Sequence, residues 1–317
     1  LFPHPWREWN DRYRDSVRQF WLGDLERGFG EGVSDIAAGI SGSSDVFYYR
    51  GPTSSINFVT AHDGFTLCDL VMYSKKRNEP NQEDNRDGSN ENRSWNMGIE
   101  GPSDDPKITA LRHSLKKSMM ATLLLSAGVP MITMGDEISR TQNGSNNSYS
   151  MPRDMHVDIA DSPETLMGGW ANKWDLSDDE LDMREAVAEL ARIRKTYLAD
   201  IAAEFFTGRV DLGTQRKDIA WFSLGGNEMT DEHWGDGDKR SLTVFIDAGP
   251  DRGLLLLLNS STEETLFTLP NAQWGTSYRR IFDAASPVTL HEPQIQQPEV
   301  KVSVAPHCAQ VWLVTRH

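Results

Sequence analysis

The stretch Ile56-Asn57-Phe58-Val59-Thr60-Ala61, followed directly by His62-Asp63-Gly64, decides how this sequence is expected to fold. The stretch is short, apolar and contains β-branched residues, which predicts a strand buried on both faces. It ends at a histidine and an aspartate. In barrels of parallel strands, functional groups lie on the loops that follow the carboxyl ends of the strands. Residues 56–61 therefore predict a buried strand that presents His62 and Asp63 at its end.

A long polar loop, a helix and a second strand follow. Residues 78–101 are crowded with Asn, Asp, Glu, Arg and Gly, and a polar loop of this length is more often functional than idle. Asp105 and Pro106 then provide an N-cap and a first-turn proline for a helix that is expected to end at Gly128. Residues 129–134 predict a second buried strand.

Strands and helices alternate along the first two hundred residues. Apolar residues at three-to-four spacing predict two further helices, over residues 11–22 and 177–197. This alternation, with polar loops after the strands, is typical of a (β/α) barrel. After about residue 203 the pattern changes to short strands separated by Gly, Pro, Asn and Asp, which predicts a separate all-β domain. Its strands are expected at 219–223, 241–247, 253–259, 264–269, 278–283 and 310–315.

Composition limits the classes of partner. The 317 residues include 32 Lys and Arg against 47 Asp and Glu, a formal net charge of −15. This charge repels phosphate backbones and anionic lipids, so neither nucleic-acid nor membrane-surface binding is expected. The chain starts without Met and without a secretory signal, and Cys68 and Cys308 fit no disulfide or metal spacing. We expect free thiols, a cytoplasmic location and a start within a longer protein.

Residues 57–67 closely resemble a characteristic region of the α-amylase superfamily, glycoside hydrolase family 13. The surrounding stretches narrow the resemblance to bacterial glycogen debranching enzymes of the isoamylase type, and together they cover most of residues 6–258. The stretches similar to that subfamily are Trp6-Arg7-Glu8-Trp9-Asn10, Tyr13-Arg14-Asp15, Glu83-Asp84-Asn85-Arg86-Asp87-Gly88, Asn92-Arg93-Ser94-Trp95-Asn96, Gly128-Val129-Pro130, Gly135-Asp136-Glu137, Arg140-Thr141-Gln142 and Asp218-Ile219-Ala220-Trp221-Phe222.

The resemblance implies roles for five residues. In such enzymes the residue matching Asp63 is the third carboxylate, which binds sugar hydroxyls in subsite −1 and stabilises the transition state. The residue matching His62 hydrogen-bonds the same ring. Such bonds strengthen as the oxocarbenium-like transition state gains positive charge. Arg140, Asn146 and Tyr149 match a family stretch near the substrate cleft, and a solvated, turn-rich loop explains them nearly as well.

The resemblance also implies that part of the enzyme is missing. A retaining glycosidase needs a carboxylate nucleophile and a general acid roughly 5 to 5.5 Å apart, and no segment here resembles the family regions that carry them. We therefore expect an α/β fold: the last part of a (β/α)8 TIM barrel, about strands 6 to 8, over residues 1–202, followed by a small all-β sandwich domain over residues 203–317. An exposed barrel edge is expected to invite dimerisation or docking of the missing part.

The expected activity is that of the parent enzyme. It would hydrolyse α-1,6 branch linkages of glycogen or limit dextrin with retention of configuration. The isolated chain would be catalytically inactive, because it would depend on the missing amino-terminal part of the same enzyme. Two alternatives stay open. The chain could come from another family 13 hydrolase or transglycosylase that acts on α-1,4 linkages, or it could be a non-catalytic glucan-binding fragment.

Several other residues have a simpler interpretation. Asp136 and Glu137 are interpreted as structural, because adjacent side chains at a strand end point to opposite sides. Residues 83–94 imitate a calcium loop only loosely, with Ser94 in place of the bidentate glutamate, so neither a metal nor another cofactor is expected. One or two of the tryptophans are expected to face a sugar cleft, and the candidates are Trp6, Trp9, Trp95, Trp170 and Trp174.

Overall fold

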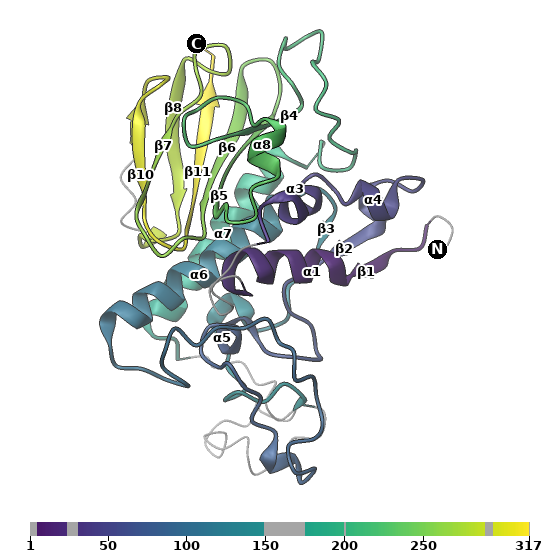
Figure 1. Ribbon diagram of the computed structural model, residues 1–317, viewed down its shortest axis with the longest axis vertical. Helices are drawn as coiled ribbons and strands as arrows, with labels where there is room; N and C mark the ends of the chain where they lie inside the picture. Colours follow the sequence, from purple (N-terminus) through teal and green to yellow (C-terminus); the bar gives the residue numbers. More distant parts are fainter. Residues whose placement is uncertain (1–4, 24–30, 149–174, 200, 289–293, 317) are drawn as a thin grey trace.

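Three short parallel strands organise the amino-terminal half (Figure 1). They are β1 (Glu8–Asn10), β2 (Ser55–Asn57) and β3 (Val129–Pro130), with β2 in the middle. This computed structural model describes residues 5–23, 31–148, 175–199, 201–288 and 294–316. Both strands placed from the residue pattern are present, and β1 is a third strand whose position the pattern did not indicate.

Strands β2 and β3 are shorter than predicted, because their backbone ladder stops early. The last ladder bond runs from the backbone N–H of Met131 to the carbonyl of Asn57, at 2.8 Å, and Pro130 has no N–H to donate. Beyond this point side chains connect the two segments. The hydroxyl oxygens of Thr60 and Thr133 lie 3.1 Å apart. The prediction of strands over 56–61 and 129–134 was therefore wrong in length.

The helices follow the predicted pattern. Helix α1 (Asp11–Arg18) continues as a π-helical turn, η1 (Gln19–Gly23). Asp105 caps α6 (Pro106–Leu124), accepting from the Lys107 N–H at 2.8 Å. A capping box at Ser177 starts α7 (Asp178–Tyr197). The shorter elements are α3 (Ser34–Ile40), α4 (Ser44–Phe47), η2 (Pro52–Ser54), α5 (Leu67–Leu70), η3 (Glu79–Asn81), η4 (Asp136–Ile138) and α8 (Asp231–Trp234).

The carboxyl-terminal part consists of two antiparallel sheets. A six-stranded sheet has the order β4-β5-β6-β11-β8-β9, and β7 pairs with β10 in a second sheet. All six strands predicted from the sequence are present, and β9 and β10 are additional. The strands are β4 (Ile219–Phe222), β5 (Ser241–Asp247), β6 (Arg252–Asn259), β7 (Thr265–Thr268), β8 (Ser277–Asp283), β9 (Ile295–Gln296), β10 (Lys301–Val304) and β11 (Cys308–Thr315).

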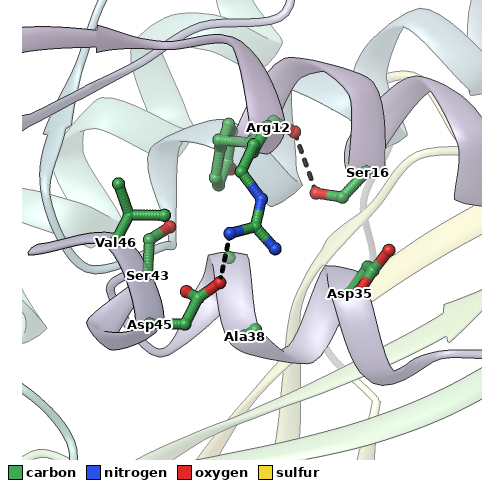
Figure 2. A pocket seen from close by; sticks show the side chains of 9 residues that line it. Arg12, Ser16, Asp35, Ala38, Ser43, Asp45 and Val46 are labelled. Carbon is green, nitrogen blue, oxygen red and sulfur yellow. Dashed lines mark hydrogen bonds and ion pairs between the residues drawn. The ribbon is translucent and has the colours of Figure 1, made fainter.

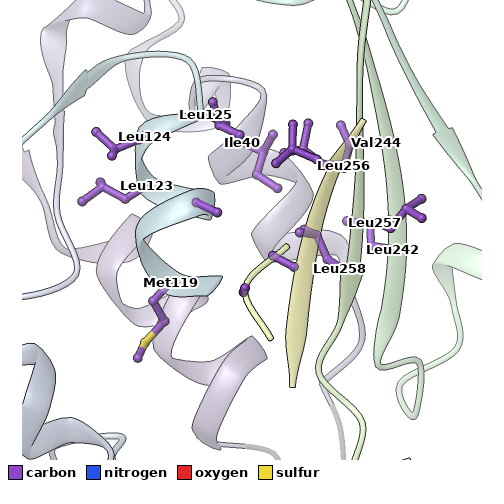
Figure 3. Close-up of a cluster of buried hydrophobic side chains, with 14 of the residues drawn as sticks. Ile40, Met119, Leu123, Leu124, Leu125, Leu242, Val244, Leu256, Leu257 and Leu258 are labelled. Atoms are coloured by element: carbon purple, nitrogen blue, oxygen red, sulfur yellow. The ribbon is translucent and has the colours of Figure 1, made fainter. Parts of the chain in front are cut away.

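One hydrophobic core joins the helices to the large sheet. Figure 3 shows leucines at the end of α6 and leucines of β6, which belong to one buried cluster, and α6 contacts β11, the neighbour of β6 in the sheet. Residues 254–258 of β6 are all at most 1% exposed, so both faces of this strand are covered. Helix α6 lies between the sheet and α1 (Figure 1). The β domain therefore packs directly on the helix that precedes β3.

Two further observations bear on the sequence predictions. Cys68 and Cys308 are buried and free, which confirms the prediction of two unpaired thiols. Within the described ranges, no helix is both long enough and apolar enough to cross a membrane.

Candidate active site

His62 and Asp63 lie in the connection between β2 and α5. The His62 Nε2 is 3.0 Å from the Asp63 Oδ2, and the two side chains are 60% and 78% exposed. The indole of Trp9, from β1, meets the His62 ring edge-on with centroids 5.6 Å apart. Trp9 is half exposed and also packs on Phe58. The structure thus places the two predicted residues together, accessible to solvent and beside one of the candidate tryptophans.

A cleft of about 500 Å³ runs past Asp63. Four segments that are distant in sequence form it: helix α1, the connection that carries Asp63, the long polar loop, and the loop after η4 that carries Asn146 and Asn147. Its lining is entirely polar or glycine, which suits a ligand rich in hydroxyl groups. The lining residues are Arg14, Asp15, Arg18, Asp63, Gly64, Gly88, Ser89, Glu91, Asn92, Arg93, Asn146 and Asn147.

Asn146 lies at this cleft, but its side chain is held inside the protein. It is 2% exposed. Its Oδ1 accepts from Asn78 at 2.7 Å, and its Nδ2 donates to the Asn92 Oδ1 at 2.8 Å and to the Ser89 carbonyl at 2.7 Å. Its own carbonyl accepts the Gly64 N–H at 2.9 Å. Asn146 therefore connects the polar loop to the turn that carries Asp63, and a direct contact with sugar stays a prediction.

Lys76 holds the polar loop in place, and sequence reasoning missed it. The side chain is buried, and its Nζ donates to the carbonyls of Asp87 at 2.7 Å and Gly88 at 3.0 Å. These carbonyls belong to the segment that imitates a calcium loop, and the Lys76 ammonium is the cation that they bind. Among the described residues, no three His, Cys, Asp or Glu side chains gather as they would around a metal ion.

Two fully buried carboxylates lie behind the turn. Asp136, in η4, accepts from the Thr60 hydroxyl and from the Leu67 N–H at 3.0 Å. Asp69, in α5, accepts from the Thr141 hydroxyl and from the Gln142 N–H at 2.8 Å. Burial raises the pKa of Asp136 to about 6, and burial also raises the pKa of Asp69. These contacts support the structural interpretation of Asp136.

Arg140 is buried near these carboxylates and is absent from the described lining of the cleft. Its Nη1 donates to the Gln142 Oε1 at 3.0 Å, and its Nε donates to the Met134 carbonyl at 3.1 Å. Burial lowers the pKa of Arg140, and the charges of Asp136 and Asp69 oppose this shift. Arg140 therefore acts first as an internal counter-charge, and its predicted contact with substrate stays untested.

The remaining candidates are placed as follows. Tyr149, Trp170 and Trp174 lie outside the described residues. Trp6 is 62% exposed, whereas Trp95 is partly buried against the core and near the His307 ring. Trp9 is thus the candidate tryptophan that lies beside His62.

A second pocket lies between α1, α3 and α4 (Figure 2). Arg12 forms an ion pair with Asp45 at 2.7 Å across it. Its volume is about 40 Å³, which accommodates a few water molecules rather than a sugar ring. Of these two pockets, the cleft at Asp63 is therefore the better candidate for a glucan.

Comparisons with known proteins show which sequences this chain is similar to. Residues 218–316 match the family described as isoamylase, C-terminal. The chain is 40% identical over 302 residues to the glycogen operon protein GlgX homolog of Mycobacterium tuberculosis, covering 90% of this chain and 39% of that protein. It is 37% identical over 279 residues to the glycogen debranching enzyme of Pectobacterium atrosepticum, covering 87% and 37%. The chain thus spans about two fifths of the length of these relatives.

Solved structures resemble the chain in fold. The pullulanase from Bacillus acidopullulyticus matches with a TM-score of 0.59 at 16% identity, over 97% of this chain and 30% of that one. The pullulanase type I from Bacillus subtilis, complexed with maltose, matches with a TM-score of 0.57 at 19% identity, over 98% and 35%. In both cases nearly all of this chain corresponds to about a third of a larger protein.

Proposed function

We propose, on the premise that this chain belongs to the family of isoamylase-type glycogen debranching enzymes, that it is the carboxyl-terminal part of an enzyme that hydrolyses α-1,6 branch linkages with retention. The observation that carries the proposal is the position of Asp63. It is an exposed carboxylate beside an imidazole, in the connection that follows the parallel strand β2 and on a polar cleft. We assign residues 1–202 to the last part of the barrel and residues 203–317 to the β domain.

Three parallel strands with intervening helices support the assignment to a barrel. Strands β1, β2 and β3 are adjacent in the order of the sequence, as successive barrel strands are. Among the described strands, β1 and β3 each pair with β2 alone. Their outer edges are therefore available to the strands of the missing amino-terminal part, which we propose as the partner of this chain.

Asp63 and His62 have the chemistry that the proposed role requires. An ionised carboxylate accepts charge-assisted hydrogen bonds from sugar hydroxyls, each worth about 1.5 to 3 kcal/mol. These bonds strengthen as positive charge develops on the ring in the transition state. His62, 3.0 Å from the same carboxylate, can bond the ring from the side. Asp63 therefore stabilises charge without forming a covalent bond.

Among the described residues that line the cleft, we assign no two carboxylates as the nucleophile and the general acid. The other carboxylates of the cleft are Asp15 and Glu91. Asp15 accepts from Arg14 at 2.7 Å and lies 3.7 Å from Arg93, so it is held as an ion-pair partner. We therefore propose that the nucleophile and the general acid come from the amino-terminal part of the enzyme, and that the isolated chain does not turn over substrate.

The proposed substrate is a branched α-glucan such as glycogen or limit dextrin. The relatives named as glycogen debranching enzymes and the maltose-bound pullulanase support this class. A neutral polymer is also compatible with a chain of net charge −15, which disfavours nucleic acid and anionic membranes. Two buried free thiols support a reducing location such as the cytoplasm.

The test is release of reducing ends from limit dextrin, pullulan and amylose. The purified chain would be assayed alone and after mixing with the amino-terminal part of its parent enzyme, with folding checked by circular dichroism. We expect no release by the chain alone, and release from branched substrates after mixing. Turnover by the chain alone would contradict the missing catalytic pair. Preference for amylose would contradict α-1,6 specificity and favour the α-1,4 alternative.

A further inference from the structure

The turn that carries His62 and Asp63 is attached to the rest of the protein at few points. Asp63 is 78% exposed, and its neighbour His62 is the one residue with which it forms an ion pair in the described structure. At the tip, the Gly64 N–H donates to the Asn146 carbonyl at 2.9 Å. Gly64 has φ of +112°, a conformation that other residues rarely adopt. The position of Asp63 therefore depends on how the base of this turn is held.

One carboxylate holds both sides of the base. The Oδ2 of Asp136 accepts from the Thr60 hydroxyl, three residues before Asp63, and its Oδ1 accepts from the Leu67 N–H at 3.0 Å, four residues after it. Asp136 is fully buried and comes from η4, after β3. A single side chain on one segment thus joins the two ends of a turn on another.

We propose that Asp136 is a positioning residue for Asp63, and that its two carboxylate oxygens together keep the His62–Asp63 turn in the geometry that binds glucan. The role in glucan binding rests on the proposed function. The geometric part stands without it. Asp136 touches no substrate, because it is buried and is absent from the described lining of the cleft.

The donors at this site favour a carboxylate over an amide. Both partners donate, since an N–H and a hydroxyl each point a proton at a separate oxygen. An asparagine offers one acceptor only, so the bond from Thr60 is lost or reversed. The charged groups that act on Asp136 are Arg140, which favours its ionised form, and Glu137, which opposes it. The charge of Asp136 also acts to raise the pKa of Arg18, which lines the cleft.

Retaining a charge at this buried position is costly for the fold. Burial raises the pKa of Asp136 to about 6, which means that the protein pays in stability to keep it ionised at neutral pH. A neutral residue of the same shape would avoid this cost. A buried ion that disfavours folding is consistent with a role in holding a functional geometry.

The experiment compares Asp136→Asn with Asp69→Asn in the full chain. Asp69 is the control, because it is equally buried and bonds residues 141–142 and, on the turn's side, the Thr66 hydroxyl alone, whereas Asp136 bonds both ends of the turn. Thr60→Val is a second variant, which removes the donor and leaves the Asp136 charge in place. For each protein we would measure amide hydrogen exchange at Gly64, thermal unfolding, and the affinity for maltotetraose by calorimetry.

We expect Asp136→Asn to speed exchange at Gly64 and to weaken maltotetraose binding by about tenfold, without lowering the unfolding temperature at neutral pH. Thr60→Val should also speed exchange at Gly64 and weaken maltotetraose binding. Asp69→Asn should leave the exchange rate and the affinity near the wild-type values. Unchanged Gly64 exchange in Asp136→Asn and Thr60→Val would overturn the inference, as would an equal effect of Asp69→Asn. If the wild-type chain binds no maltotetraose, the proposed function is in doubt, and Gly64 exchange alone decides the positioning role.

Discussion

At the scale of single residues, Asp63 is the most direct test of the proposed chemistry. In the parent enzyme, Asp63→Asn should lower kcat/KM for limit dextrin by at least about 100-fold, because hydrogen bonds that strengthen in the transition state contribute several kcal/mol. Asp84→Asn is the control, since it removes the same charge from an exposed position that does not line the cleft. Steady-state rates of reducing-end release measure both. Nearly unchanged debranching by Asp63→Asn would exclude the assigned role.

The titration of Asp136 makes the stability of the protein depend on pH. The pKa of Asp136 is raised from 3.8 to about 6 by burial, so the folded protein binds a proton more tightly than the unfolded chain. The contribution of this group to stability is therefore complete below pH 3.8 and is lost as pH rises through about 6. A shift of this size corresponds to about 3 kcal/mol at neutral pH.

Asp136→Asn should remove that dependence. Relative to the wild type, the variant should gain stability by up to about 3 kcal/mol as pH rises from acid to neutral. Urea unfolding of both proteins at a series of pH values measures the difference. A constant difference across the range would show that Asp136 does not titrate within it.

At the scale of elements, the contact between α6 and β11 joins the two halves of the chain. The Ser118 hydroxyl accepts from the Ala309 N–H at 2.9 Å and lies 3.3 Å from the His307 carbonyl. Ser114, one turn earlier, donates to the same carbonyl at 3.1 Å. Both serines are buried, and Ser114 also bonds the Cys308 thiol. Only Ser118 satisfies a backbone donor of the strand.

Ser118→Ala should therefore cost more stability than Ser114→Ala. Leaving the buried Ala309 N–H unpaired costs about 1 to 3 kcal/mol, whereas the His307 carbonyl retains Ser118 when Ser114 is replaced. Chemical unfolding of the two variants measures the difference. Equal losses of stability in the two variants would mean that apolar packing alone holds α6 against β11.

Element length shows a limit of sequence patterns. The alternation of strands and helices was predicted correctly, and the N-caps at Asp105 and Ser177 mark helix starts in both sequence and structure. The ends of β2 and β3 were not predicted, because a run of apolar residues indicates burial rather than pairing. Pairing stops at Pro130, and the hydroxyls of Thr60 and Thr133 continue the contact.

At the scale of the whole molecule, the open edges of the parallel sheet compete with the net charge. Among the described strands, β1 and β3 are each paired on one side only, while the chain carries a charge of −15. Unpaired edges favour association, and like charges oppose it. We expect self-association that increases with salt, because about 0.5 M salt screens the repulsion to within a few ångströms.

Sedimentation velocity at low and high salt measures this balance. Adding the amino-terminal part of the parent enzyme should convert the self-associated species into a one-to-one complex, since both would use the same edges. If the chain stays monomeric at every salt concentration and does not bind the amino-terminal part, the proposal that the outer edges of β1 and β3 are open is contradicted.

The sequence by itself determined the order of elements, the placement of His62 and Asp63 in the connection that follows β2, and the all-β character of the carboxyl-terminal region. These depend on local properties: side-chain period, turn residues and caps. The tertiary structure decided what depends on contacts between distant segments. It brought Asn146 to Gly64 and Asp136 to both ends of the His62–Asp63 turn. No local pattern specifies these hydrogen bonds, because their partners lie up to about 80 residues apart.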